Sequence, residues 1–263
     1  ILKEVNRDGR TMSFLAWFLD GDIDVRLPEI LDLSKKVCPW LPTQIFTNGV
    51  ANTELLENQK LDMANFTIST HNHELYRLVH GKDHFDDVMF NLSHFLEHKY
   101  ANQKVEIHCV LTKDNVAYAQ DWYDYFKPYT EHYSNVKLVL SPLVASVDNV
   151  ASREALGAYT IDDLEKVVID IAGEEGRMWT RSLIPDLKPC VLWDNLSVDT
   201  YGYWLQCCNW SNSELYNYGH IQDFIDNGIR LKDVWQKRLA NRMNNRVCEG
   251  CNMKHPEWRK RLC

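Results

Sequence analysis

Short apolar segments alternate with amphipathic segments along the first half of the chain. Residues 105–111 alternate between apolar and polar side chains, which predicts a strand with one buried face. Residues 85–96 instead repeat their apolar side chains every three or four positions, which predicts a helix with one apolar face. Similar patterns predict further strands at 12–19, 43–46, 65–70 and 136–140, and further helices at 28–37, 53–58, 122–126 and 161–171.

Strands and helices that alternate in this order are typical of an α/β fold with a parallel sheet. About five strands are predicted, fewer than the eight of a complete barrel, so we expect a partial (βα) barrel over residues 1–142. The capping-box pair of Thr160 and Asp163 indicates a helix start within a helical bridge, residues 143–185. Residues 186–263 are then expected to form a small cysteine-rich, metal-binding module.

The composition is that of a globular protein, with 45% hydrophobic and 25% charged residues among 263. A net charge of -8 argues against a general nucleic-acid-binding surface, so nucleic acid is not expected as a partner. No apolar run reaches the roughly 18 residues of a membrane span, and no signal peptide is visible. These features predict a cytoplasmic protein with no membrane partner.

Most of the eight cysteines lie in the last third of the chain, which favours metal binding over disulfides in a cytoplasmic protein. A C-x-x-C pair follows two upstream cysteine positions, so four thiolates are expected to converge on one centre. Their number suits a tetrathiolate zinc ion and a four-iron cluster equally well. The predicted ligands are Cys190, Cys207, Cys248 and Cys251.

The remaining cysteines have other predicted roles. A hairpin turning near residues 199–202 is expected to bring Cys190 and Cys207 together. Cys208 is adjacent to Cys207, and adjacent residues on a strand point to opposite faces, so one of the two is expected to bind the centre. Whether Cys263 is a ligand stays open. Cys38 and Cys109 lie in apolar segments and are expected in the core.

Polar and glycine residues collect just after the predicted strands, where βα barrels and open α/β sheets place their active sites. Thr-Asn-Gly is nevertheless also an ordinary turn sequence. These residues are Asp22, Thr47, Asn48, Gly49, Ser69 and Asn115. Four nearby histidines are either metal ligands, general bases or solvated loop residues, namely His71, His73, His80 and His84.

Several motifs of the last third occur in an order typical of one enzyme family. They are Pro189-Cys190, Gly202 with Cys207 five residues later, Tyr218-Gly-His-Ile221, Asp233-Val-Trp235 and Cys248-x-x-Cys251. Through them the chain resembles the C-terminal two thirds of a radical S-adenosylmethionine (SAM) enzyme that carries a SPASM or twitch-type auxiliary-cluster domain. The first half resembles the family more loosely, through Asp20-Gly-Asp22, Phe46-Thr-Asn-Gly49, Ile68-Ser69 and the segment from Phe85.

The resemblance implies that the four C-terminal cysteines hold an auxiliary [4Fe-4S] cluster, and the distance from Gly202 favours Cys207 over Cys208 as a ligand. It also implies an oxidoreductase or modifying enzyme that generates a 5′-deoxyadenosyl radical from SAM. The implied substrate is a peptide or a small molecule. A flavodoxin or ferredoxin is the implied electron donor.

The resemblance further implies where SAM binds. Asp22 occupies the position of the family's acidic residue that pairs with the SAM amino group. The turn of Thr47, Asn48 and Gly49 would lie beside it, and Ser69 and Asn115 would contact the ribose and the methionyl group. These six residues are therefore the expected cofactor-binding residues.

One departure from the family pattern is large. The Cys-x-x-x-Cys-x-x-Cys motif that holds the SAM-cleaving cluster is absent. We expect that this motif, with a second [4Fe-4S] cluster, belongs to a segment upstream of Ile1, and that the chain alone is inactive in SAM cleavage. An alternative from another class is a non-catalytic α/β binding protein in which the same four cysteines hold a structural zinc ion.

Overall fold

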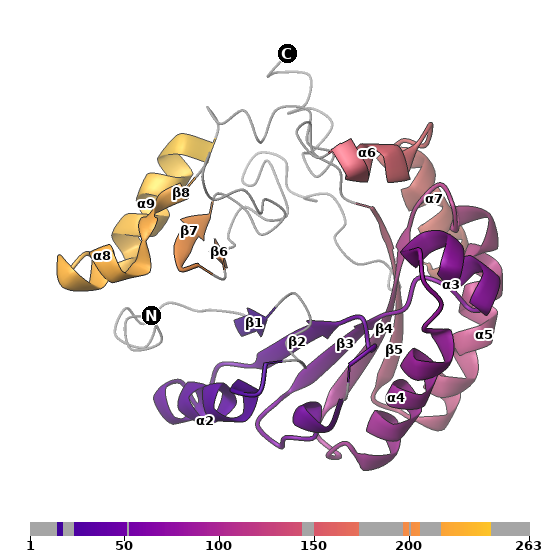
Figure 1. The fold of residues 1–263 in the computed structure, drawn as a ribbon, viewed down its shortest axis with the longest axis horizontal. Helices are drawn as coiled ribbons and strands as arrows, with labels where there is room; N and C mark the ends of the chain where they lie inside the picture. Colours follow the sequence, from indigo (N-terminus) through magenta and orange to yellow (C-terminus); the bar gives the residue numbers. More distant parts are fainter. Residues whose placement is uncertain are drawn as a thin grey trace. The chain divides into compact units, whose positions relative to one another are not determined.

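The chain divides into two compact units, which are described separately (Figure 1). The computed structural model describes residues 15–17, 24–51, 53–143, 150–173, 197–199, 201–205 and 217–242. One unit, here called the sheet unit, comprises Leu2–Pro142 and Ala158–Met178. The other, here called the hairpin unit, comprises Ile1, Leu143–Gly157 and Trp179–Cys263.

The sheet unit is built on a five-stranded sheet in which every neighbouring pair of strands is parallel. The strand order follows the sequence, so each connection carries the chain from the carboxyl end of one strand back to the amino end of the next. This arrangement confirms the α/β fold and the number of strands predicted. The strands are β1 (Leu15–Trp17), β2 (Thr43–Thr47), β3 (Met63–Thr67), β4 (Lys104–Leu111) and β5 (Val136–Pro142).

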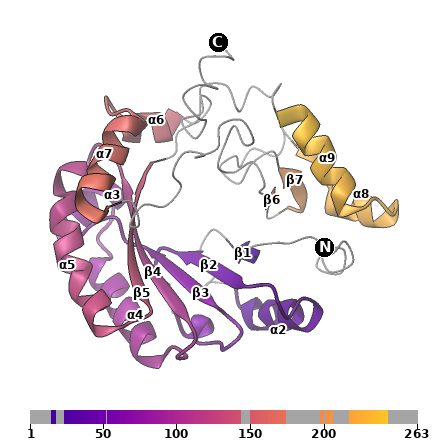
Figure 2. The same cartoon turned by 180° about the vertical axis from the view of Figure 1, so that it is seen from behind.

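Helices of the sheet unit lie along one face of this sheet, as opposite views show for α4, α5 and α7 (Figures 1 and 2). The capping box predicted at Thr160 is present, because the side chains of Thr160 and Asp163 each accept from the other's backbone N–H. No helix in the described ranges is long and apolar enough to cross a membrane. The helical elements are α2 (Leu27–Val37), η2 (Thr53–Leu56), α3 (His73–His80), α4 (Phe85–His98), η3 (Val116–Tyr118), α5 (Ala119–His132) and α7 (Ile161–Ala172).

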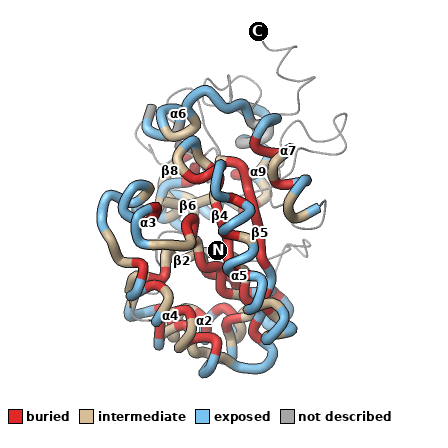
Figure 3. The backbone as a smooth tube through the Cα atoms, turned by 90° about the vertical axis from the view of Figure 1, so that its right-hand side faces the viewer, coloured by how far each residue is buried: buried red, intermediate tan, exposed pale blue. Residues whose placement is uncertain are grey.

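The register of the strands identifies the face that packs against the helices. The rings of Phe66 on β3 and Phe95 on α4 are 5.5 Å apart, so Phe66 points toward the helices. Ile107 and Leu138 lie beside Phe66 in register, and all three are buried. Strands β4 and β5 are buried along most of their length (Figure 3). Side chains one position away along each strand therefore point to the opposite face.

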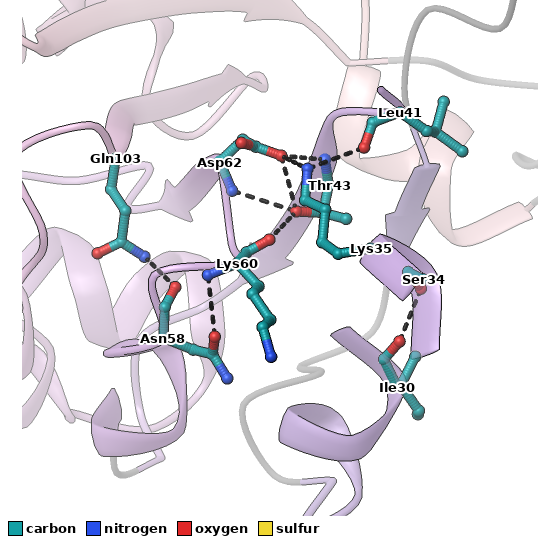
Figure 4. A network of polar contacts seen from close by, with 9 residues as sticks. All are labelled: Ile30, Ser34, Lys35, Leu41, Thr43, Asn58, Lys60, Asp62 and Gln103. Carbon is teal, nitrogen blue, oxygen red and sulfur yellow. Dashed lines mark hydrogen bonds and ion pairs between the residues drawn. The ribbon is translucent and has the colours of Figure 1, made fainter. Parts of the chain in front are cut away.

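Polar contacts join the amino ends of the strands (Figure 4). Asp62 Oδ2 accepts hydrogen bonds from Thr43 N at 2.7 Å and from Lys35 Nζ at 2.5 Å. Gln103 Nε2 donates to the carbonyl of Asn58 at 3.0 Å. These bonds tie α2, the start of β2 and the residues preceding β3 and β4 together at one end of the sheet.

Two predicted elements differ from the structure. The helix expected at 53–58 is one 3₁₀ turn, η2, and the strand expected at 65–70 is β3, Met63–Thr67. Beyond β3 the ladder ends because Val110 N donates to the Ser69 hydroxyl at 3.2 Å instead of to a backbone carbonyl. Helix α3 was not predicted: the Asn72 side chain accepts from Leu75 N at 3.0 Å and begins this helix where a loop was expected.

The hairpin unit contains the turn predicted near residues 199–202. Strands β6 (Ser197–Val198) and β7 (Tyr203–Leu205) are antiparallel, and β7 also pairs with β8 (Asn217–His220). Asp199 Oδ1 accepts from the backbone N–H groups of Tyr201 and Tyr203 at 2.9 and 2.8 Å, which closes the turn. Gly202 has a φ of +89°, which favours glycine at this position. The unit's helices are α6 (Val150–Leu156), α8 (Ile221–Asp226) and α9 (Leu231–Arg242).

Candidate functional site

The first group of predicted cofactor-binding residues forms a tight turn at the carboxyl end of β2. Gly49 N donates to Thr47 Oγ1, and Val50 N donates to Asn48 Oδ1, both at 2.9 Å. Gly49 has a φ of +72°, and a Cβ at this position would lie 3.1 Å from the Phe66 ring. Thr-Asn-Gly therefore forms a backbone turn, and the side chains of Thr47 and Asn48 each accept a hydrogen bond within it.

Ser69 and Asn115 meet at the carboxyl ends of β3 and β4. Asn115 Nδ2 donates to the Ser69 carbonyl at 2.8 Å and to the Val110 carbonyl at 2.9 Å. Asn115 Oδ1 accepts from Thr112 N at 2.7 Å. Both amide hydrogens of the buried Asn115 are thus engaged in joining the two strand ends. Two predicted residues from distant parts of the sequence therefore lie together.

The two residues after Ser69 carry buried polar atoms that lack partners among the described residues. These atoms are the Thr70 hydroxyl oxygen and His71 Nδ1. His71 Nε2 lies 3.1 Å from Asn72 Nδ2, an amide nitrogen that donates only, so Nε2 accepts and Nδ1 carries the ring proton. Burial lowers the pKa of His71, and Asp121 partly opposes this effect, which favours the neutral ring. The His71 Nδ1–H group and the Thr70 hydroxyl are consequently able to form hydrogen bonds with a polar ligand.

The other three histidines of this region contact neighbouring side chains. His73 Nδ1 contacts the Asp83 carboxylate at 3.0 Å, and His84 Nδ1 contacts the Asp87 carboxylate at 3.0 Å. The rings of His80 and Tyr76 on α3 are 4.4 Å apart. Burial lowers the pKa of His80. Of the four histidines considered from the sequence, His71 is the one with an orphaned buried nitrogen.

A buried histidine–serine pair lies on the sheet face opposite the helices. His108 on β4 is one position from Ile107, and its Nε2 lies 2.7 Å from the hydroxyl oxygen of Ser141 on β5. Burial lowers the pKa of His108 to about 4, so the ring is neutral near pH 7. This pair was not predicted from the sequence, because only the apolar positions of the alternating 105–111 segment indicate the buried strand face. The polar positions of the same alternation were the available signal.

The same face carries a row of polar residues nearer the amino end of the sheet. Asn65, Glu106 and Lys137 lie in register on β3, β4 and β5. The buried Oδ1 of Asn65 accepts no hydrogen bond among the described residues. Burial raises the pKa of Glu106, and Lys137 partly opposes this effect. The face therefore offers hydrogen-bonding groups instead of the continuous apolar surface of a sheet covered by helices on both sides.

The remaining predicted site residues lie outside the described residues. They are Asp22 and the four metal ligands Cys190, Cys207, Cys248 and Cys251. Cys208 and Cys263 also lie outside, so the choice among these thiols stays a prediction. Cys38 and Cys109 are buried, as expected of core residues, and burial raises the pKa of both thiols. High thiol pKa values disfavour the thiolate form that binds metals.

Taken together, the described part of the site is a buried, polar carboxyl edge. It combines a glycine turn after β2, a hydrogen-bonded junction between β3 and β4, and orphaned groups at Thr70 and His71. The chemistry of such an edge is hydrogen bonding to polar groups. Parallel α/β sheets bind ligands at this edge.

Comparison with known proteins identifies relatives by fold. No protein-family model matches the sequence, and no curated protein sequence does. The structure is similar to SuiB of Streptococcus suis, with TM-scores of 0.61 for SuiB bound to S-adenosylmethionine, 0.62 for SuiB, and 0.58 for SuiB bound to the precursor peptide SuiA. Sequence identities are 14%, 12% and 13%, respectively, and each alignment covers 96% of this chain.

The alignments cover 64%, 64% and 63% of the three SuiB chains, so this chain spans about two thirds of the length of SuiB. At this level of sequence identity the similarity concerns the fold. The α/β fold predicted from the alternation of strands and helices is thus confirmed, and it is similar to the fold of SuiB.

Proposed function

We propose that this chain is part of a radical SAM enzyme that modifies a peptide. The observation that carries the proposal is the polar carboxyl edge of a parallel sheet whose fold is shared with SuiB, a protein solved with SAM and with a precursor peptide. The motif order in the last third and the fold shared with SuiB both support this proposal. The activity belongs to the whole protein, of which this chain need be only a part.

SAM fits the carboxyl edge by the chemistry of its polar groups. Its ribose hydroxyls and methionyl carboxylate need hydrogen-bond donors, and the neutral His71 presents a buried Nδ1–H without a partner among the described residues. The Thr70 hydroxyl can donate or accept. Ser69, Asn115 and the turn at residues 47–49 would then hold the backbone of the site in place, and Asp22 would pair with the SAM ammonium.

SAM, together with a reduced iron–sulfur cluster, supplies radical chemistry that removes a hydrogen atom from a substrate. The task of the chain's own residues is to orient SAM and the peptide and to exclude water. The hydrogen-bonding face that carries Asn65, Glu106 and the His108–Ser141 pair suits a peptide, which is rich in amide groups. A flavodoxin or ferredoxin in the cytoplasm would serve as the electron donor.

We further propose that residues 186–263 hold an auxiliary [4Fe-4S] cluster through Cys190, Cys207, Cys248 and Cys251. The hairpin supports this ligand set, because antiparallel strands enter and leave at the same end. Ser197 of β6 pairs with Leu205 of β7, so the strand pairing that closes the turn extends to within two positions of Cys207 in the sequence. The adjacent Cys208 is expected not to bind the cluster.

Metal analysis tests this assignment. The chain is purified without oxygen and reconstituted with iron and sulfide, and about four irons per chain are expected. Cys248→Ala, Cys251→Ala and Cys207→Ala should each lose most of this iron. Cys208→Ala and Cys38→Ala are the matched controls and should retain it.

Two outcomes contradict the cluster. Stoichiometric zinc with no iron after reconstitution would favour the alternative, a binding protein with a structural zinc ion. Iron loss in Cys38→Ala equal to that in Cys251→Ala would show that the ligand assignment is wrong.

A further inference from the structure

A second group of potential metal ligands lies on the sheet unit, near the amino end of β4. It consists of Glu57, which follows η2, and of His94 and His98 in the last turns of α4. Gln103, the residue before β4, donates its Nε2 to the carbonyls of Leu56 and Asn58 at 3.1 and 3.0 Å. These bonds fix the backbone on both sides of Glu57, and Figure 4 shows the bond to Asn58.

The three side chains converge. His94 and His98 are four residues apart on one helix face, and their rings stack with centroids 4.1 Å apart. One ligand atom from each of Glu57, His94 and His98 can be chosen so that all three lie within 4.8 Å of one another. His94 Nδ1 lies 3.2 Å from Glu57 Oε1. This separation matches the distance of about 3.3 Å between two ligands of a tetrahedral zinc ion with bonds near 2.0–2.1 Å.

The hydrogen bonds around the cluster prepare it for a metal. His98 Nδ1 lies 2.8 Å from the carbonyl oxygen of His94, which only accepts, so Nδ1 carries the proton and the lone pair is on Nε2. Histidines that bind metals commonly donate their second ring nitrogen to a carbonyl in this way. Glu57 Oε1 is buried, and its neighbour among the described residues is the His94 ring, with Nδ1 at 3.2 Å. A buried carboxylate oxygen is stabilised by a cation, which a protonated His94 or a metal ion can supply.

We propose that Glu57, His94 and His98 bind one divalent zinc-class ion. Two imidazole nitrogens and one carboxylate oxygen suit Zn²⁺ and disfavour Mg²⁺ or Ca²⁺, which prefer oxygen ligands. A fourth position stays open to water, because His98 lies at an exposed helix end. The ion joins the end of α4 to the turn after η2. This site is independent of the cysteines and of the proposed function.

Zinc binding to the full chain tests the proposal after the cysteine sites have been filled by anaerobic iron–sulfide reconstitution. Wild type is expected to retain one more zinc per chain than His98→Ala or Glu57→Gln. Each variant should also weaken zinc binding by about tenfold or more, since even changes next to a metal ligand cost 10–100-fold. His132→Ala is the matched control, because His132 also ends a helix and is exposed. It should retain full zinc content.

A second readout locates the ion without relying on total zinc. Modification of histidines by diethylpyrocarbonate, followed by peptide mass spectrometry, should show that zinc protects His94 and His98 but leaves His132 unprotected. Equal labelling of His94 and His98 with and without zinc would overturn the proposal. So would equal zinc content in wild type, His98→Ala and Glu57→Gln.

Discussion

At the scale of single residues, the clearest departure from ordinary behaviour is a buried neutral imidazole. His108 sits on β4 with its Nε2 2.7 Å from Ser141 Oγ, and burial lowers its pKa from 6.5 to about 4. The pKa of His71 is also lowered by burial, with Asp121 opposing. Both rings are therefore able to form hydrogen bonds as neutral groups.

His108 should make the stability of the protein depend on pH in the acidic range. Between pH 6.5 and about 4 the unfolded chain binds a proton that the folded chain does not, so the free energy of unfolding falls as pH falls through this window. Above pH 6.5 this contribution is constant. The full effect is on the order of 3 kcal/mol. Urea unfolding of wild type and His108→Gln at several pH values should show a flatter dependence in the variant. Identical slopes would contradict a buried neutral His108, and His132→Gln serves as the control.

At the scale of elements, one carboxylate joins α2 to the amino ends of two strands. Asp62 accepts from Lys35 Nζ, from Thr43 N and from Thr43 Oγ1 (Figure 4). Burial alone would raise the pKa of Asp62, but the hydrogen bonds from Lys35 and Thr43 together lower it. The bonds favour the charged form, so their contribution to stability is present at neutral pH and is lost as pH falls below the ordinary range of Asp.

Asp62→Ala should therefore lower the free energy of unfolding by about 2 kcal/mol at pH 7, a value within the range for hydrogen bonds to charged groups. The exposed pair of Lys60 and Asp32, with Nζ 2.6 Å from Oδ1, is the matched control. Asp32→Ala should cost less than about 1 kcal/mol, because both side chains are solvated. Denaturant midpoints of both variants measure the difference. Equal destabilisation would show that the Asp62 network contributes no more than a surface ion pair.

The elements also show what local sequence patterns can predict. Strands β4 and β5 and helices α4 and α7 follow from periodicity and, for α7, from the Thr160–Asp163 capping box, because these signals are local. The start of α3 was not predicted, because it depends on a hydrogen bond to the Asn72 side chain. Asn side chains form similar bonds to the backbone in non-helical segments, so the residue type alone does not identify a helix start. His94 and His98 were overlooked within a helix identified by its apolar face, although their four-residue spacing is itself a ligand signal.

At the scale of the whole molecule, prediction depends on which residues meet across long sequence distances. The contact of Asn115 with Ser69 spans 46 residues and was expected only through a shared strand edge. The orphaned groups of Thr70 and His71 cannot be recognised from sequence, because lack of a partner is a property of the packed chain. The order of cysteine and glycine motifs, in contrast, led to the resemblance to a family, and the structure shares its fold with SuiB.

The two compact units lead to a final prediction, that the two proposed cofactor sites can be lost separately. Thr70→Val should weaken SAM binding up to about tenfold, as expected for loss of one buried hydrogen bond, and should leave iron content unchanged. Cys251→Ala should remove the iron and change SAM affinity by less than about twofold, because the two residues belong to different units. Equilibrium dialysis with labelled SAM and iron analysis measure both properties on the same samples. Loss of iron in Thr70→Val would show that the units are coupled, whereas unchanged SAM binding in this variant would remove Thr70 from the SAM site.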